Sequence, residues 1–335
     1  MLDLARLRGI RLAPKPHFQR AVGGTLLHPM YQLFPGVPIH FEGFNPEDLK
    51  GRSVIFAMNH TDRYNYFPFQ MKLWKGYDRY TATWVKGKYF ENPVLAAFFE
   101  AAAQIPVPSR GYLISRDFKN VVGREPSQDE YAALRSHFEA QMLGRIPAGA
   151  KMPDGIPPAL QSQARSMLGR PFDGKEDYFD AIRNTFDEMM DEFVALNQQA
   201  TEVGLNIIVF PQGTRSKRLS KGHIGLAQMA LHLDLPIIPV GCNGCDHVYP
   251  GNSPIPRAGK ITYRFGKPIE PKDMEAWRPK EPFRPFIPED EHKHRANFQA
   301  LVDHVMDQIN ELLDPEYQYA EDKSSDGVKG TDRFL

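Results

Sequence analysis

The chain has only two cysteines among its 335 residues, Cys242 and Cys245, in the sequence CNGC. Two cysteines are too few for the disulfide framework of a small secreted protein, and a reducing compartment suits them better. A structural zinc site needs about four ligands, and the chain has no second cysteine pair to complete one. We therefore expect two small core or loop thiols and no metal site.

The chain also lacks an excess of charge of either sign, because 41 Lys and Arg residues balance 41 Asp and Glu residues. This balance argues against a nucleic-acid partner, which a basic field would attract. One local exception is the N-terminal stretch, where Asp3 is outnumbered by Arg6, Arg8, Arg11, Lys15 and Arg20. Such a segment could lie on anionic lipid headgroups or could be a solvated basic arm.

Long hydrophobic runs are missing as well. The longest candidate, VLAAFFEAAAQIPV (94–107), is short and is interrupted by Glu100 and Gln104, whereas a membrane-spanning helix needs about 20 apolar residues. The N-terminal residues have no apolar core of the kind that a secretory signal requires. We predict a cytoplasmic protein without a transmembrane helix.

Short apolar runs bounded by turn residues predict buried strands. They are SVIFAM (53–58), LNIIVF (205–210), PIIPVG (236–241) and ITYRFG (261–266). Helical spacing of apolar residues predicts helices over 177–203, with Gly204 as the stop, and over 224–233 and 296–313. The alternation predicts an α/β fold, with a central mostly parallel or mixed sheet and helices on both faces.

The remaining segments predict additions to this core. Residues 1–37 form the basic N-terminal arm, and residues 117–176 form an insertion, with Ser127 and Glu130 in capping-box spacing before a stretch rich in proline and glycine. Residues 271–318 predict a C-terminal extension that ends in the last helix, with a surface loop over 278–295. The polar residues 319–335 predict a disordered tail.

Two motifs follow predicted strands. NHTDRYNYF (59–67) places His60 where a buried strand ends, and an imidazole can carry a proton near neutral pH. FPQGTRS (210–216) follows the next predicted strand and brings backbone amides, the Thr214 hydroxyl and the Arg215 guanidinium to a turn. A guanidinium can bind two phosphate oxygens at once, so this turn predicts an anion site.

The NH pair, GYLISR (111–116), FPQGTRS and LPIIPVG (235–241) occur in this order and together resemble the four motif blocks of the glycerolipid acyltransferase superfamily. WVKGKYF (84–90) and KGHIGLAQMA (221–230) resemble the segments that precede the second block and follow the third. The resemblance covers roughly residues 38–270, which predicts an acyltransferase domain of that extent.

The resemblance implies an O-acyltransferase, similar to 1-acylglycerol-3-phosphate acyltransferases. It would move a fatty acyl group from acyl-CoA or acyl-carrier protein to a hydroxyl of a lysophospholipid or glycerol phosphate. His60 would be the general base. The substrate-binding residues would be Arg116, Gln212, Gly213, Thr214, Arg215 and Ser216, with the two arginines on the phosphate. No metal or bound cofactor is implied, and a bilayer substrate implies a peripheral position on the inner face of the cell membrane.

Two residues depart from the family pattern, since Asn65 and Gln212 stand where the family has carboxylates. An aspartate both fixes the tautomer of a catalytic histidine and stabilises the imidazolium, whereas an asparagine oxygen does only the first. Asp62 is a candidate substitute, or it caps the next helix.

The departures keep alternatives open. The chain could be a catalytically silent lipid-binding protein on the same fold, or an enzyme for a different hydroxyl or amine acceptor. The insertion could cover the acyl or acceptor pocket and change substrate choice, or it could be a tolerated surface excursion.

Overall fold

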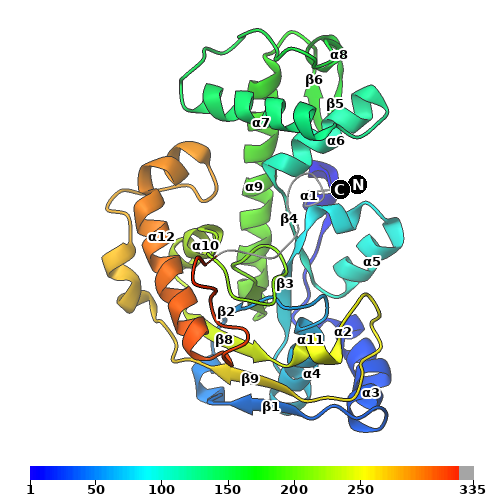
Figure 1. Cartoon of the computed structure of the whole chain (residues 1–335), viewed down its shortest axis with the longest axis vertical. Helices are drawn as coiled ribbons and strands as arrows, with labels where there is room; N and C mark the ends of the chain where they lie inside the picture. The colour runs from blue at the N-terminus through cyan, green and yellow to red at the C-terminus, as the bar shows by residue number, and fades with distance from the viewer. Residues whose placement is uncertain (324–335) are drawn as a thin grey trace.

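The computed structural model describes residues 1–323 and is built around a seven-stranded sheet (Figure 1). The strand order is β1-β9-β8-β2-β7-β3-β4. The strands are β1 (Ile39–Glu42), β2 (Ile55–Met58), β3 (Thr81–Lys86), β4 (Ile105–Val107), β7 (Asn206–Val209), β8 (Ile237–Asn243) and β9 (Ile261–Phe265). Every neighbouring pair is parallel except β8 and β9, so the predicted mostly parallel sheet is confirmed.

Helices cover both faces of the sheet (Figure 1). They are α1 (Leu4–Gly9), α2 (His17–Val22), η1 (Gly23–Leu27), α3 (His28–Gln32), η2 (Pro46–Leu49), α4 (Tyr66–Tyr77), η3 (Gly87–Phe90), α5 (Pro93–Ala101), α6 (Arg110–Val122), α7 (Gln128–Met142), α8 (Ala159–Ser162), α9 (Tyr178–Glu202), α10 (Gly225–Leu233), α11 (Cys245–Val248), η4 (Pro271–Trp277) and α12 (Pro288–Glu311). The predicted helix stop is confirmed, since Gly204 has a left-handed φ of 81°.

Two hydrophobic cores lie on opposite faces of the sheet, and strand β2 contributes to both. Ile55 and Ala57 join a core with α1, α5, α6, α9, α10 and α12, while Phe56 and Met58 join a core with α3, α4 and α11. Successive side chains of a strand point to opposite faces, so a strand covered on both sides must be apolar at every position. This double burial is why the central strands read as unbroken apolar runs.

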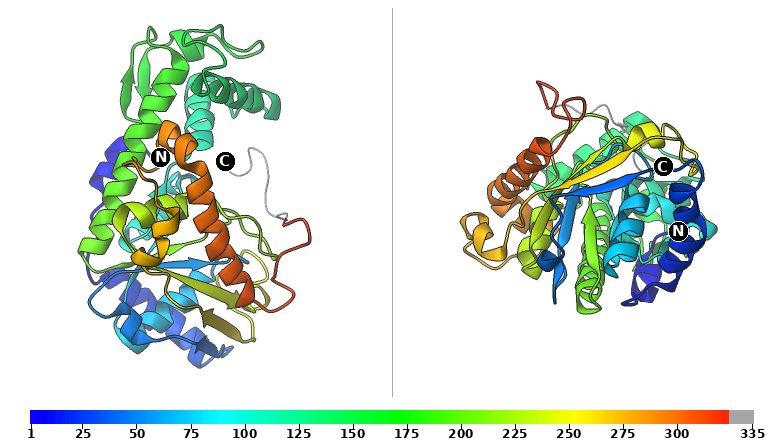
Figure 2. Two further views of the ribbon diagram at one scale, coloured as in Figure 1. Left: turned by 90° about the vertical axis from the view of Figure 1, so that its left-hand side faces the viewer. Right: turned by 90° about the horizontal axis from the view of Figure 1, so that it is seen from below.

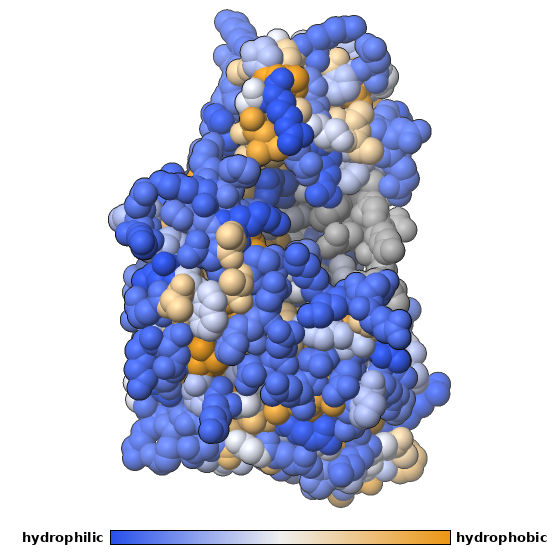
Figure 3. Space-filling view, turned by 60° about the vertical axis from the view of Figure 1, so that its left-hand side comes forward, coloured by the Kyte–Doolittle hydropathy of each residue, from blue (hydrophilic) through white to orange (hydrophobic). Residues whose placement is uncertain are grey.

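The insertion forms a head at one end of the molecule, beside the N-terminal half of α9 (Figures 1 and 2). It contains α7, α8 and a two-stranded antiparallel hairpin, β5 (Arg165–Met167) and β6 (Arg170–Phe172), which the sequence pattern did not indicate. The capping box is present, because the Ser127 hydroxyl accepts the Glu130 N–H and the Glu130 carboxylate accepts the Ser127 N–H. The surface in Figure 3 is mostly hydrophilic, with small hydrophobic patches that include one on the head.

The first residues of the chain are not the free basic arm that the sequence predicted. Leu2, Leu4 and Leu7 are buried in the larger core. The nearby positive charges are paired, since Arg6 lies 2.8 Å from the Glu100 carboxylate, Arg8 lies 2.7 Å from Glu192, and Lys15 lies 2.7 Å from Asp78. Apolar side chains one turn apart on α1 bury this segment, a pattern that the basic residues between them concealed.

The C-terminal extension differs from its prediction over residues 278–295, because α12 already begins at Pro288. Proline suits the first turn of a helix, and the acidic residues that follow it favour the positive helix N-terminus. The predicted disordered tail is described only over 319–323, where the Tyr319 N–H donates to the Asn310 side chain. Its remainder, 324–335, lies outside the described residues. Within residues 1–323, no helix combines the length and the apolar character needed to cross a bilayer.

A buried ion pair ties the head to α6. The Arg165 guanidinium donates to both oxygens of Asp117, at 2.9 and 2.6 Å, and the Asp117 side chain is fully buried. Replacing Arg165 with Met leaves a buried carboxylate unpaired, so we expect Arg165→Met to lower the free energy of unfolding by about 3–5 kcal/mol, measured by urea titration. The exposed Lys151–Asp154 pair supplies the control, since Lys151→Met should cost less than about 1 kcal/mol. Equal losses would contradict the role of the buried pair.

Candidate active site

The carboxyl ends of β2, β7 and β3 meet at one edge of the sheet. Strand β2 pairs in parallel with β7, with Ile55 opposite Ile207, and β3 pairs in parallel with the other side of β7. The loop after β2 carries His60, the turn after β7 is the FPQGTRS motif, and β3 ends at Lys86. Neighbouring parallel strands therefore bring together segments that lie 150 residues apart in the chain, from His60 to Phe210.

His60 is held by the turn at residues 210–216, called here the third-block turn. The His60 N–H donates to the Gln212 side-chain oxygen at 3.0 Å, and the His60 carbonyl accepts the Ser216 N–H at 2.9 Å. The imidazole stacks on the Phe210 ring, with centroids 4.2 Å apart and an interplanar angle of 18°. Main chain and ring are thus both fixed by the same turn.

Asn59, the residue before the histidine, attaches the loop to the other neighbour of β2. Its side-chain nitrogen donates to the Cys242 carbonyl at 3.0 Å, and its side-chain oxygen accepts the Cys242 N–H at 2.7 Å. Both hydrogen bonds replace the pairing that the strand would have continued. The loop that carries His60 is therefore anchored to β7 on one side and to β8 on the other.

Asn65 is the hydrogen-bond partner of the imidazole. Its side-chain oxygen lies 3.3 Å from His60 Nδ1, and its side-chain nitrogen donates to the Asn59 carbonyl at 2.9 Å. The carbonyl can only accept, so the amide nitrogen must face it and the amide oxygen must face the ring. Nδ1 therefore carries the hydrogen and Nε2 keeps its lone pair, as a general base requires.

Gln212 is buried and uses both ends of its amide within the protein. Besides accepting the His60 N–H, it donates from Nε2 to the Arg218 carbonyl at 3.2 Å and to the Ser220 hydroxyl at 3.3 Å. The resemblance implied a substrate-binding role for this side chain. The structure instead engages it with three protein groups, so it shapes the turn and positions His60.

The other third-block residues also shape the turn. Gly213 has a φ of 66°, and a Cβ there would stand 2.7 Å from the His223 ring, so no other residue fits without strain. Thr214 is buried, and the Ser216 hydroxyl donates to the Arg218 carbonyl at 2.7 Å.

Asp62 does not hydrogen-bond to the imidazole, so it is not the substitute partner that the sequence allowed. Its carboxylate accepts the Tyr64 N–H at 2.8 Å and the Thr61 hydroxyl at 2.9 Å, and it also accepts the thiol of Cys245. Nor does it cap α4, whose N-cap position is Asn65. Asp62 instead closes the turn between His60 and Asn65.

The charges that act most strongly on His60 are positive. Burial lowers the pKa of the His60 imidazole to about 3, and the charges of Arg215 and Lys86 add to this effect, while the Asn65 hydrogen bond opposes it. The ring is therefore neutral at physiological pH. Arg116, in contrast, lies on α6 and pairs with Glu91 at 2.7 Å. The charge of Arg215 therefore acts on the histidine, whereas Arg116 is directed to a carboxylate.

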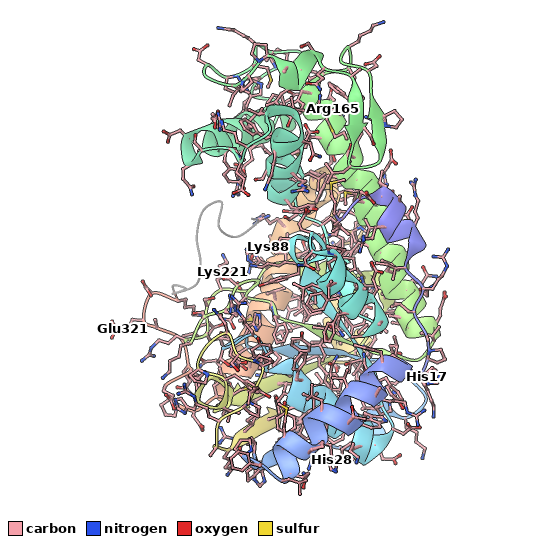
Figure 4. The ribbon with its side chains drawn as sticks, turned by 90° about the vertical axis from the view of Figure 1, so that its right-hand side faces the viewer. His17, His28, Lys88, Arg165, Lys221 and Glu321 are labelled. Carbon is pink, nitrogen blue, oxygen red and sulfur yellow. The ribbon has the colours of Figure 1, made fainter. Side chains whose placement is uncertain are left out.

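Several residues at this edge were not assigned a role from the sequence. Phe210 and Lys86 both lay inside quoted motifs, and their place at strand ends was the signal that could have identified them. Figure 4 places Lys88, on η3, and Lys221, after the third-block turn, at the level between the sheet and the head that carries Arg165. Cys242 and Cys245 are buried, as predicted for core thiols.

The buried Asp62 carboxyl predicts a pH dependence of stability. Burial raises its pKa from 3.8 to about 6. A carboxyl with a raised folded-state pKa contributes stability below about pH 4 that is lost as the pH rises through 6. Between pH 4 and pH 8 we expect wild type to lose about 3 kcal/mol of unfolding free energy relative to Asp62→Asn. Urea titrations at both pH values measure this difference. The control Asp154→Asn, at an exposed site, should lose as much unfolding free energy between the two pH values as wild type does. If Asp62→Asn also loses as much as wild type, the raised pKa of Asp62 is not the cause.

Comparison with known proteins gives a partial match. No family model matches the chain. A stretch of 73 residues, 21% of the chain, is 38% identical to a 1-acyl-sn-glycerol-3-phosphate acyltransferase of Cocos nucifera, and it spans 24% of that relative's length. The crystal structure of the 1-acyl-sn-glycerophosphate acyltransferase PlsC from Thermotoga maritima aligns over 91% of this chain and 81% of that one, at 14% identity and a TM-score of 0.37. This partial sequence match agrees with the resemblance of the four ordered motif blocks to the glycerolipid acyltransferase superfamily, and the chain spans about a quarter of the length of that relative.

Proposed function

We propose that the protein transfers a fatty acyl group from a thioester to a hydroxyl of a lysophospholipid or glycerol phosphate, with His60 as the general base. The observation that carries this proposal is the orientation of the imidazole. Asn65 and the third-block turn hold the ring so that Nδ1 is protonated and Nε2 is available as a proton acceptor. A residue with no part in proton transfer has no need of a fixed tautomer.

The reaction needs one proton to move twice. As the acceptor oxygen attacks the thioester carbonyl, its proton passes to His60 Nε2 and the carbonyl oxygen becomes an oxyanion. The tetrahedral intermediate then expels the thiolate, which takes the proton from the imidazolium. The products are an ester and a free thiol, and His60 returns to its starting state.

The acceptor's phosphate finds its partners at the same edge of the sheet. Arg215 projects from the third-block turn, within electrostatic reach of His60, and offers a planar fork for phosphate oxygens. Arg116 is the second candidate, provided that it exchanges its Glu91 partner for the phosphate. The proposed acyl donor is acyl-CoA or acyl-carrier protein, because both deliver the acyl group as a thioester.

The competing proposal is a silent lipid-binding protein on the same fold. The observation in its favour is the replacement of both family carboxylates by the amides of Asn65 and Gln212, which leaves the imidazolium without a negative partner at either position. The fixed tautomer of His60 favours the enzyme. Papain-like enzymes, which pair a catalytic histidine with asparagine, are a precedent for catalysis with an amide partner.

A bilayer acceptor requires contact with a membrane surface, and we propose that the end of the N-terminal helical segment makes it. Helices α2, η1 and α3 follow one another without a break, and His17 and His28 in Figure 4 mark the course of this segment. Leu33 and Phe34, directly after it, are 80% and 85% exposed, and Leu26 is 53% exposed. Exposed apolar side chains at the end of a helical segment suit peripheral adsorption, which we propose takes place on the inner face of the cell membrane.

Thiol release from palmitoyl-CoA, with and without lysophosphatidate, tests the enzymatic proposal. We expect acceptor-dependent release from wild type and a loss of at least about 100-fold in His60→Ala, because general base catalysis is worth that much. His40→Ala, an exposed histidine on β1, is the matched control and should keep wild-type rates. No release from wild type with either palmitoyl-CoA or palmitoyl-carrier protein, together with retained lysophosphatidate binding, would favour the silent lipid-binding protein.

Co-sedimentation with vesicles of phosphatidylcholine and phosphatidylglycerol tests the membrane contact. The double variant Leu33→Ser and Phe34→Ser should bind at least about tenfold more weakly than wild type, because each buried apolar side chain contributes about 1.5–3 kcal/mol. Leu143→Ser, which removes an exposed leucine at the end of α7, is the control and should bind as wild type does. Equal binding by all three proteins would place the contact elsewhere.

A further inference from the structure

The side-chain amides of Asn65 and Gln212 are fixed by hydrogen bonds that carboxylates at these positions could not make. Each amide nitrogen donates to a main-chain carbonyl, that of Asn59 for Asn65 and that of Arg218 for Gln212. A carboxylate at either position would direct an oxygen at a carbonyl oxygen. The environment of His60 is therefore organised by neutral hydrogen bonds, with no negative charge from these two positions.

Within residues 1–323, the other groups that act on the imidazole do not supply that charge either. Phe210 at the end of β7 covers one face of the ring. Arg215 on the third-block turn and Lys86 at the end of β3 are the strongest charges acting on it. On its own loop, Asp62 directs its carboxylate to Tyr64, Thr61 and Cys245. Formation of an imidazolium at His60 is thus opposed by burial and by two cations.

Arg215 is placed so that a bound anion would act on His60. The hydrogen bonds from His60 to Gln212 and from Ser216 to His60 clamp the histidine main chain to the residues on either side of Arg215 in the turn. Among the described residues 1–323, Arg215 takes part in none of the ion pairs, whereas Arg116 already has Glu91. An anion that binds the Arg215 guanidinium would therefore lie within electrostatic reach of the base.

We propose that the phosphate of the acceptor completes the catalytic base, by supplying beside His60 the negative charge that the two amides do not provide. This inference rests on the proposed function and goes further, because it gives the phosphate a part in the chemical step as well as in binding. An acceptor without a phosphate would bind to an enzyme whose base is still opposed by Arg215.

The proton moves as in the proposed reaction, and the phosphate itself undergoes no covalent change. When the hydroxyl proton reaches Nε2, the new positive charge on the imidazolium is balanced by the dianionic phosphate on Arg215. The thiolate then removes the proton as it leaves. The phosphate thereby performs the electrostatic part of an aspartate's role, while Asn65 performs the orienting part.

Acceptors that differ only in the phosphate test the proposal. With monoacylglycerol in place of lysophosphatidate of the same acyl chain, kcat and not only KM should fall, by at least about 100-fold. Inorganic phosphate added with monoacylglycerol should partly restore kcat in wild type and in the control Arg145→Gln, an exposed arginine of the head, but not in Arg215→Gln. Equal kcat values for the two acceptors, with a difference in KM alone, would overturn the proposal.

A measurement on the resting protein separates this inference from the proposed function. The pKa of His60, followed by NMR with labelled histidine, should rise by about 1 or more when glycerol 3-phosphate binds to wild type or to Arg145→Gln. It should not rise in Arg215→Gln. If the pKa of His60 rises in a protein that shows no turnover, the proposed function is wrong, but the effect of the bound phosphate on His60 is supported. If the pKa of His60 does not change in a protein that binds glycerol 3-phosphate, the proposal that the phosphate completes the base is wrong, whether or not the protein turns over substrate.

Discussion

The site depends on one constraint, the two hydrogen bonds that join the main chain of His60 to the turn after the neighbouring strand, one to the Gln212 side chain and one from the Ser216 N–H. They form because β2 lies between β7 and β8 with parallel partners on both sides, so the loops that leave the sheet at its carboxyl edge must meet. Asn59 repeats the attachment on the β8 side. A histidine on a surface loop would sample many positions, whereas this one is fixed by the sheet.

The replacement of two family carboxylates looks at first like a loss of function, but the hydrogen bonds give another explanation. Asn65 and Gln212 each donate to a carbonyl that a carboxylate could not satisfy, and each still presents an oxygen to His60. Orientation is therefore retained and charge is not. Under the proposed function, the missing charge must come from elsewhere or the base must act without it, and we propose that the phosphate of the acceptor supplies it.

Much of the fold could be predicted because buried segments have recognisable patterns of apolar residues in the sequence. The central strands are covered on both faces and read as apolar runs, while α9 shows its buried stripe and its glycine stop. Strand β3, which begins with buried threonines, and the short β4 show no such pattern. The N-terminal segment was misjudged because its buried leucines alternate with arginines whose partners, such as Glu100 and Glu192, lie far along the chain.

The sequence by itself determined the order of the motif blocks, the α/β class and the identity of the candidate base, because these depend on residue types and local spacing. Only the tertiary structure decided that Asn65 fixes the tautomer, that Asp62 turns away toward Cys245, and that Arg215 rather than Arg116 acts on His60. Each of these depends on the direction of a side chain toward a distant carbonyl, thiol or carboxylate. Spacing along the chain does not encode such directions, since they arise only when parallel strands bring remote loops together.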